Sequence, residues 1–267
     1  MRKVIISVAP VNAAPHHIDP TALAEEIIAC EKAGAAMVHL HIRDENGLLT
    51  DNVEEYTKVM QKVREKSNIV LQASTGGVSN LTIEQRCAPL YLPFVETCSL
   101  NVGSVNLGTS VYQNPIEDVE TCVKTLIAQK KYPEIEVFEI GMIHTVAQLA
   151  EKYALPRPIL MNIVLGHQGE SPATPLALTT MWNFLPRDSF WGFTHAYRQD
   201  FSLMAAALGL GASLVRIGFE DSNLLPDREA ENNVVLVEEL VLLIHAIGLE
   251  VATPDEARQM MGLENRC

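Results

Sequence analysis

The sequence predicts an α/β protein in which eight parallel strands, each followed by a helix, close into a single-domain (β/α)8 TIM barrel. Short runs rich in Val, Ile and Phe alternate with longer amphipathic stretches along the whole chain, as successive βα units require. The 267 residues, 48% of them apolar, are enough for one barrel. No solenoid repeat, low-complexity tract or Pro/Gly/Ser-rich linker divides the sequence, so we expect one domain over residues 1–267.

Eight apolar runs are the strand candidates, because each is short and rich in β-branched or aromatic residues. In chain order they are Lys3–Val11, Met37–Asp44, Ile69–Thr75, Phe94–Val102, Glu134–Gly141, Pro158–Gly166, Phe190–Ala196 and Ser213–Asp221. Helices are expected between the strands. The clearest helical stretches are Pro20–Ala33, with its apolar residues on one face, Thr145–Tyr153 and Glu229–Ile247.

Polar residues gather where these strands end, which is the catalytic face of such a barrel. A core strand has no packing reason to carry them, because each unpaired polar group would cost roughly 1–3 kcal/mol when buried. We therefore interpret them as ligand-binding residues. The third and fourth strand ends supply the candidates for substrate binding, which are Ser74, Thr75, Gly76, Asn101 and Asn106.

Composition excludes several classes of partner. The net charge of −13 argues against nonspecific binding to nucleic acid or to an anionic membrane, since both need a basic surface. The sequence opens without a signal peptide, and its longest apolar stretch, at 204–215, is too short to span a bilayer. The five scattered cysteines have no metal-site spacing and are typical of a reducing cytoplasm; they are Cys30, Cys87, Cys98, Cys122 and Cys267.

The second strand candidate ends in two histidines separated by one residue, His39 and His41. Alternate side chains of a strand share a face, so both imidazoles should point the same way. This geometry suits a metal ion, and a catalytic zinc site needs three protein ligands and an open fourth position. The alternative is a pair of satisfied histidines on a buried strand.

Glu220 is the expected third ligand. It shares a face of the last strand with Arg216 and Gly218, and in a closed barrel the eighth and second strands both flank the first. Two histidines and one glutamate with an open position form a known catalytic zinc set. Asp221, one residue further on, should lie on the following turn and be free to act as a base. The alternative reading of Glu220 and Asp221 is an acidic pair that caps a helix.

Short motifs at successive strand ends are each weak alone but specific as an ordered set. They are Ala9-Pro10, His39-Leu40-His41 with Arg43-Asp44, Ser74–Gly77, Ser104–Gly108, Val137–Glu139, Leu165-Gly166, Pro172–Pro175 and Val215–Asp221. Together they resemble the β-keto acid cleavage enzymes over nearly the whole chain. The resemblance implies a zinc-dependent TIM barrel, usually a homotetramer, that converts a β-keto acid and acetyl-CoA into acetoacetate and a new acyl-CoA.

The same resemblance implies roles for individual residues. One zinc ion per chain would be held by His39, His41 and Glu220. Asp221 would be the base and Arg216 its partner. Ser74 would bind the substrate carboxylate. Zinc would act as a Lewis acid that stabilises an enolate, so that a weak carboxylate base suffices at neutral pH.

The first loop departs from the aminohexanoate-cleaving member of that family, which carries there a glutamate for the substrate amine. Residues 11–17 read VNAAPHH and hold no carboxylate. We therefore expect an uncharged or acidic β-keto acid to be a better substrate than an amino-substituted one, with Asn12, His16 and His17 available to its tail. His167 and His195, at later strand ends, are further candidates for contact with substrate or phosphate.

Two other functions remain open from the sequence. A metal-dependent aldolase or metallolyase on the same barrel would use similar ligands but would not need CoA. A non-catalytic metal-binding barrel would instead need a closed site of four ligands, whereas three ligands and an adjacent unengaged aspartate are found.

Overall fold

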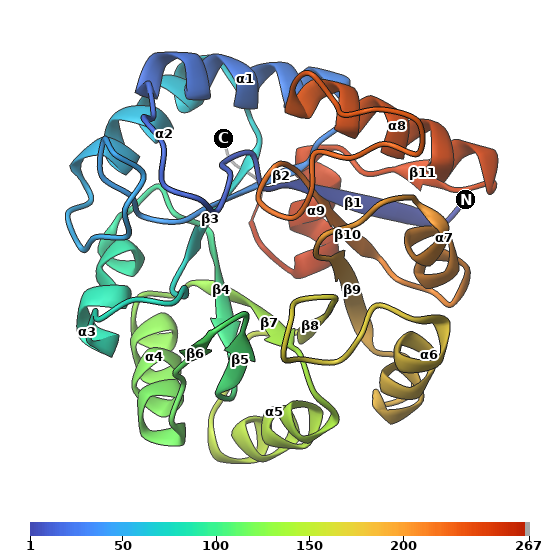
Figure 1. Ribbon diagram of the computed structural model, residues 1–267. Coiled ribbons are helices and arrows are strands. Elements are labelled where there is room, and N and C mark those ends of the chain that lie inside the picture. Colours follow the sequence, from blue (N-terminus) through green and yellow to red (C-terminus); the bar gives the residue numbers. More distant parts are fainter. Residues whose placement is uncertain (265–267) are drawn as a thin grey trace.

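The computed structural model describes residues 1–264 and confirms the expected (β/α)8 barrel. Within this range, eight parallel strands form a ring that closes where the last strand pairs with the first, Arg216 opposite Ser7. Figure 1 shows the strands at the centre and the helices around them. The ring consists of β1 (Lys3–Val8), β2 (Met37–Leu40), β3 (Val70–Ser74), β4 (Thr97–Asn101), β7 (Tyr132–Val137), β8 (Leu160–Leu165), β9 (Phe190–His195) and β10 (Leu214–Ile217).

Helices cover the outside of the ring and bury apolar stripes against the strands. They are α1 (Pro20–Ala33), α2 (Glu54–Lys66), α3 (Ile83–Arg86), the 3-10 helix η1 (Ala88–Tyr91), α4 (Ile116–Ala128), α5 (Ile140–Lys152), α6 (Pro175–Phe184), α7 (Ser202–Gly209), α8 (Asn233–Ala246) and α9 (Pro254–Met261). Helix α1 has the predicted bounds, because Asp19 caps its first amide groups and Gly34 ends it. None of the helices within residues 1–264 is long and apolar enough to cross a membrane.

The strands end earlier than the sequence predicted, and the correction matters for the site. The observed ends are Val8, Leu40, Ser74, Asn101, Val137, Leu165, His195 and Ile217. The polar residues that follow lie in loops, and α5 already begins at Ile140 inside the fifth strand candidate. The apolar pattern continues past the last ladder hydrogen bonds, so it does not mark where a strand stops. Helices α5 and α8 likewise differ from the predicted stretches Thr145–Tyr153 and Glu229–Ile247.

Several small elements were not predicted. A hairpin of β5 (Val105–Leu107) and β6 (Ser110–Tyr112) follows β4 on the catalytic side of the ring. At the opposite end, β11 (Glu250–Val251) pairs with the start of β1, and α9 places Arg258 against Glu96, next to β4. Of the five cysteines, Cys267 lies outside the described residues.

Candidate active site

Two histidines and one glutamate converge at the carboxyl ends of β2 and β10. Their donor atoms lie within 4.8 Å of one another. Oε1 of Glu220 is 3.6 Å from Nε2 of His39 and 3.4 Å from Nε2 of His41. The two imidazole rings stand nearly perpendicular, with centroids 5.2 Å apart. All three residues named by the spacing in the sequence are therefore neighbours in the fold.

The route by which Glu220 reaches the histidines differs from the one expected. Strand β10 ends at Ile217, so strand periodicity does not orient Glu220. Gly218 instead adopts φ +148°, and a Cβ there would lie 2.1 Å from the carbonyl oxygen of Ala9. The turn brings the Glu220 amide to within 3.1 Å of the same oxygen. Glycine is required at 218 because the backbones of β1 and β10 meet there.

The three side chains fit a divalent metal ion. Nδ1 of His39 is hydrogen-bonded to Oε1 of Gln72 at 2.6 Å, and Nδ1 of His41 is hydrogen-bonded to the carbonyl oxygen of Gly76 at 3.2 Å. The Nε2 atom of each ring is therefore left for a ligand. Nε2 of His39 is buried without a hydrogen-bond partner. Burial lowers the pKa of His39 to about 3, which keeps this imidazole neutral. The separations of 3.4–3.6 Å are close to the edge of about 3.4 Å in a tetrahedral site with zinc–nitrogen bonds of about 2.0–2.1 Å.

Asp221 lies beside this cluster. It is not the unengaged carboxylate that the spacing indicated, but it has the arginine partner that the family resemblance implied. Arg216 binds it through two hydrogen bonds, Nη2 to Oδ1 at 2.5 Å and Nε to Oδ2 at 3.0 Å. Both residues are buried. Arg216 is buried near the end of strand β10, and a buried cation needs an anion beside it. Two lone pairs of the Asp221 carboxylate are still available to a substrate.

Glu136 on β7 is a member of the site that sequence reasoning missed. Its Oε1 accepts a hydrogen bond from Nη1 of Arg216 at 3.2 Å. Burial raises the pKa of Glu136 to about 7, although the nearby Arg216 opposes the shift. The available signal was a pair of glutamates, Glu134 and Glu136, at alternate positions of an otherwise apolar run, which places both on the inner face.

A cavity of about 1220 Å³ opens over these residues. This volume is above the range of roughly 300–1,000 Å³ that is common for small-molecule sites. Polar residues that line the cavity include Ser74, Glu136, Arg216, Glu220 and Asp221, and ring-bearing residues that line it include Tyr112, Phe138, His167 and Tyr197.

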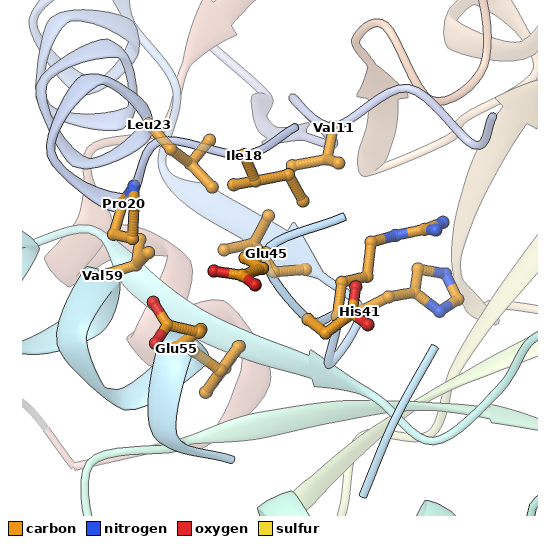
Figure 2. A pocket seen from close by; sticks show the side chains of 12 residues that line it. Val11, Ile18, Pro20, Leu23, His41, Glu45, Glu55 and Val59 are labelled. Carbon is orange, nitrogen blue, oxygen red and sulfur yellow. The ribbon is translucent and has the colours of Figure 1, made fainter. Parts of the chain in front are cut away.

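A second, much smaller cavity lies behind His41, between α1 and α2. Figure 2 shows its apolar wall, which includes Val11, Ile18 and Leu23, and the acidic side chains of Glu45 and Glu55 that also line it. Its volume of about 20 Å³ is roughly that of one water molecule. It is too small to hold an organic ligand.

The five candidates for substrate binding lie in different environments. Ser74 lines the cavity, and its Oγ accepts the amide hydrogen of Gly76 at 3.1 Å. Thr75 turns its hydroxyl into the core, where it donates to the carbonyl oxygen of Ser99. Asn101 is buried below the cavity, and Asn106 is exposed on the β5–β6 hairpin. Of the five, only the Ser74 side chain lines the cavity.

The other candidate histidines also lie in different places, and not all of them line the large cavity. His167 lines the cavity, and its Nδ1 is hydrogen-bonded to Oε1 of Glu170 at 2.8 Å. His195 lies outside the lining. His16 and His17 face a separate cavity of about 530 Å³, so the first loop presents Asn12 to the site and not these two side chains.

Comparison with known proteins gives consistent matches. The family model described as "beta-keto acid cleavage enzyme" matches residues 3–263. The 3-keto-5-aminohexanoate cleavage enzyme of Fusobacterium nucleatum is 35% identical over 246 residues, covering 91% of this chain and 89% of the relative. The enzyme of the same name from Acetoanaerobium sticklandii is 33% identical, covering 98% and 99%.

A more distant relative and a solved structure extend the comparison. The 3,5-dioxohexanoate:acetyl-CoA acetone transferase of Paraburkholderia graminis is 27% identical, covering 98% of this chain and 96% of the relative. A structure described as "Ternary complex of ObcA with C4-CoA adduct and oxalate" has a TM-score of 0.76 at 20% identity, covering 94% and 68%. At this identity the structural match establishes the fold alone.

Proposed function

This chain belongs to the β-keto acid cleavage enzyme family, and from that premise we propose that it exchanges acyl groups between a β-keto acid and acetyl-CoA at a zinc ion. The observation that carries the proposal is the placement of the His39, His41 and Glu220 cluster beside the Arg216–Asp221 pair, at the base of one large cavity. The products would be acetoacetate and a new acyl-CoA.

Asp221 is the proposed base. It would take a proton from the carbon between the keto and carboxylate groups of the substrate, and that carbon would then attack the thioester carbonyl of acetyl-CoA. The released CoA thiolate would attack the original keto carbon. The carbon–carbon bond would break there, which gives the new acyl-CoA and the acetoacetate carbanion. Asp221 would return the proton to this carbanion, so that atoms and charges balance.

Arg216 has two roles in this proposal. Its two hydrogen bonds hold the Asp221 carboxylate in one orientation. Its positive charge also lies where negative charge develops on the substrate oxygens. Glu136 supports the third nitrogen of the guanidinium group and so fixes its plane. Ser74, on the cavity wall, is proposed to bind the substrate carboxylate.

His39, His41 and Glu220 would hold the zinc ion, because two imidazoles and one carboxylate suit zinc better than magnesium or calcium. A bound zinc ion supplies Lewis acidity, which lowers the free energy of an enolate. Thr75, Asn101 and Asn106 stay predictions as substrate contacts and are the weakest of the set, given their places in the fold.

A substrate with an uncharged tail is the proposed preference. The part of the first loop that lines the cavity consists of Asn12, Ala13, Ala14 and Pro15, none of which is an anion. The relative from Paraburkholderia graminis is named for 3,5-dioxohexanoate, whose tail is uncharged. We also propose that the chain works as a cytoplasmic homotetramer of single-domain subunits, as the family resemblance implies.

The proposal is tested by assaying the purified enzyme with a panel of β-keto acids. Turnover should need both the keto acid and acetyl-CoA, stop when zinc is chelated and return when zinc is added. Turnover that does not depend on acetyl-CoA would favour a metal-dependent aldolase. Stoichiometric zinc without turnover on any β-keto acid would favour a non-catalytic barrel.

A further inference from the structure

A chain of hydrogen bonds crosses the barrel interior beneath the proposed metal ligands. It begins at His39 on β2, whose Nδ1 lies 2.6 Å from Oε1 of Gln72 on β3. The side-chain nitrogen of Gln72 donates to Oε2 of Glu134 on β7 at 2.8 Å. The other carboxylate oxygen of Glu134 accepts a hydrogen bond from Asn162 on β8. The chain thus connects a metal ligand to a carboxylate in the middle of the barrel.

The composition of this layer is unusual for the fold. The interior of a TIM barrel is normally filled by branched apolar residues. Here Gln72, Glu134 and Asn162 are each at most 1% exposed. Burial raises the pKa of Glu134, although hydrogen bonds from Gln72 and the charge of Arg216 oppose the shift. A buried carboxylate destabilises the folded state relative to an apolar residue of similar size, so packing alone does not account for Glu134.

The order of donors and acceptors determines the tautomer of His39. A carboxylate only accepts hydrogen bonds, so Glu134 turns the amide nitrogen of Gln72 towards itself. The amide oxygen of Gln72 then faces His39, and Nδ1 of His39 carries the hydrogen. Nε2 of His39 is left with a lone pair, is buried without a hydrogen-bond partner and lies 3.6 Å from Oε1 of Glu220. This lone pair is the one that a metal ion would use.

We propose that Glu134 is a positioning residue, which acts through Gln72 to hold the His39 imidazole with Nε2 towards the metal site. The backbone already pairs His39 with Gln72 across the two strands, so what Glu134 adds is the orientation of the amide. Partners that orient a metal-ligating histidine typically change metal affinity 10- to 100-fold. The inference rests on the proposed function, because it requires the metal site.

Glu134→Gln is the direct test, because an amide at this position can present either its oxygen or its nitrogen to Gln72. We expect the zinc affinity, measured by competition with a chromogenic chelator, to fall about 10- to 100-fold. In metal-free protein with ¹⁵N-labelled histidine, the ring signals of His39 should change from the Nδ1–H tautomer to a mixture. Those signals are assigned by their loss in His39→Ala.

Glu136→Gln is the matched control. It also removes a buried carboxylate from β7, two residues further on, but Glu136 is bonded to Arg216 and not to Gln72. Glu136→Gln should therefore lower the zinc affinity less than Glu134→Gln does, and it should leave the His39 tautomer unchanged. The double variant Gln72→Glu with Glu134→Gln reverses the pair and still offers an acceptor to Nδ1 of His39, so it should regain the zinc affinity of the wild type.

The outcomes separate the inference from the proposed function. Equal zinc affinity in Glu134→Gln and Glu136→Gln, or an unchanged His39 tautomer, overturns the inference alone when the wild type binds zinc. A folded double variant that still binds zinc weakly also overturns it, and this variant carries the test if Glu134→Gln does not fold. A wild-type protein that binds no zinc overturns the proposed metal site, and the inference with it.

Discussion

Arg216 holds the Asp221 carboxylate with two nitrogens of one guanidinium group, at 2.5 and 3.0 Å, and the same guanidinium group reaches Glu136 at 3.2 Å. A bidentate pair of this kind fixes orientation as well as charge. It also links β10 to β7 across the inside of the barrel. Because one guanidinium group contacts both carboxylates, we expect substitution of any one of these three residues to disturb the other two.

Replacing Asp221 by Asn tests the base. The variant keeps the shape of the side chain but loses the charge, so turnover should fall about 10²- to 10⁴-fold, the range for positioned acid–base catalysis. Zinc content should not change, because Asp221 is not one of the three clustered ligands. Asp227→Asn, on an exposed loop, is the control and should keep full turnover. Turnover of Asp221→Asn equal to that of the wild type would remove Asp221 from the mechanism.

His41→Ala tests the metal site. Loss of one of three ligands should remove tightly bound zinc, as measured by elemental analysis after dialysis. The barrel should keep its circular dichroism spectrum, because the ligands lie on the catalytic face and not on the stabilising one. His17→Ala is a matched exposed histidine outside the cluster and should keep its zinc. Stoichiometric zinc in His41→Ala would show that the site is elsewhere.

Glu136→Gln should change how the stability of the metal-free protein depends on pH. Burial raises the pKa of Glu136 from 4.5 to about 7, so between these values the folded state binds more protons than the unfolded state. The contribution of Glu136 to the free energy of unfolding is therefore largest below pH 4.5 and is lost as the pH rises through 7. Between these two pH values, the contribution of Glu136 to the free energy of unfolding should change by about −1.4 kcal/mol per pH unit.

Urea unfolding at a series of pH values between 5 and 7.5 measures this contribution as the difference between the wild type and Glu136→Gln. The difference removes the titrations of groups that do not interact with Glu136. Parallel stability curves for the two proteins would mean that Glu136 titrates alike in the folded and unfolded states.

The first loop predicts a preference among substrates. A β-keto acid with a methyl terminus should exceed its amino-substituted analogue in kcat/KM by tenfold or more, because each roughly 1.4 kcal/mol of uncompensated ammonium desolvation is a factor of ten. Asn12→Glu places a carboxylate on the cavity wall and should reduce or reverse the preference. An amino substrate that is already preferred by the wild type would contradict this account of the pocket.

The metal cluster could be predicted from the sequence because its residues are few and their types are specific. Two histidines at alternate positions and a glutamate at the end of the eighth strand candidate were enough to place His39, His41 and Glu220 together. The path of the backbone that brings Glu220 to the two histidines was less predictable. Apolar periodicity continued beyond Leu40 and Ile217, so the turn at Gly218 that brings Glu220 inward was hidden within a supposed strand.

The residues that support the cluster were harder to find. Gln72, Glu134 and Glu136 belong to apolar runs and were counted as strand, although polar side chains on the inner face of a barrel must face one another. Asn106 stays a predicted substrate contact, but its surroundings were not foreseen either. A hairpin that the apolar pattern did not signal carries it away from the cavity wall and into solvent.

The most direct test of the central claim is isotope tracing with acetyl-CoA labelled with ¹³C at both acetyl carbons. The proposed exchange takes carbons 3 and 4 of acetoacetate from acetyl-CoA and carbons 1 and 2 from the β-keto acid. Mass spectrometry and ¹³C NMR should therefore find acetoacetate labelled only at carbons 3 and 4, in amounts equal to the new acyl-CoA. Unlabelled cleavage products that form without acetyl-CoA would contradict the account.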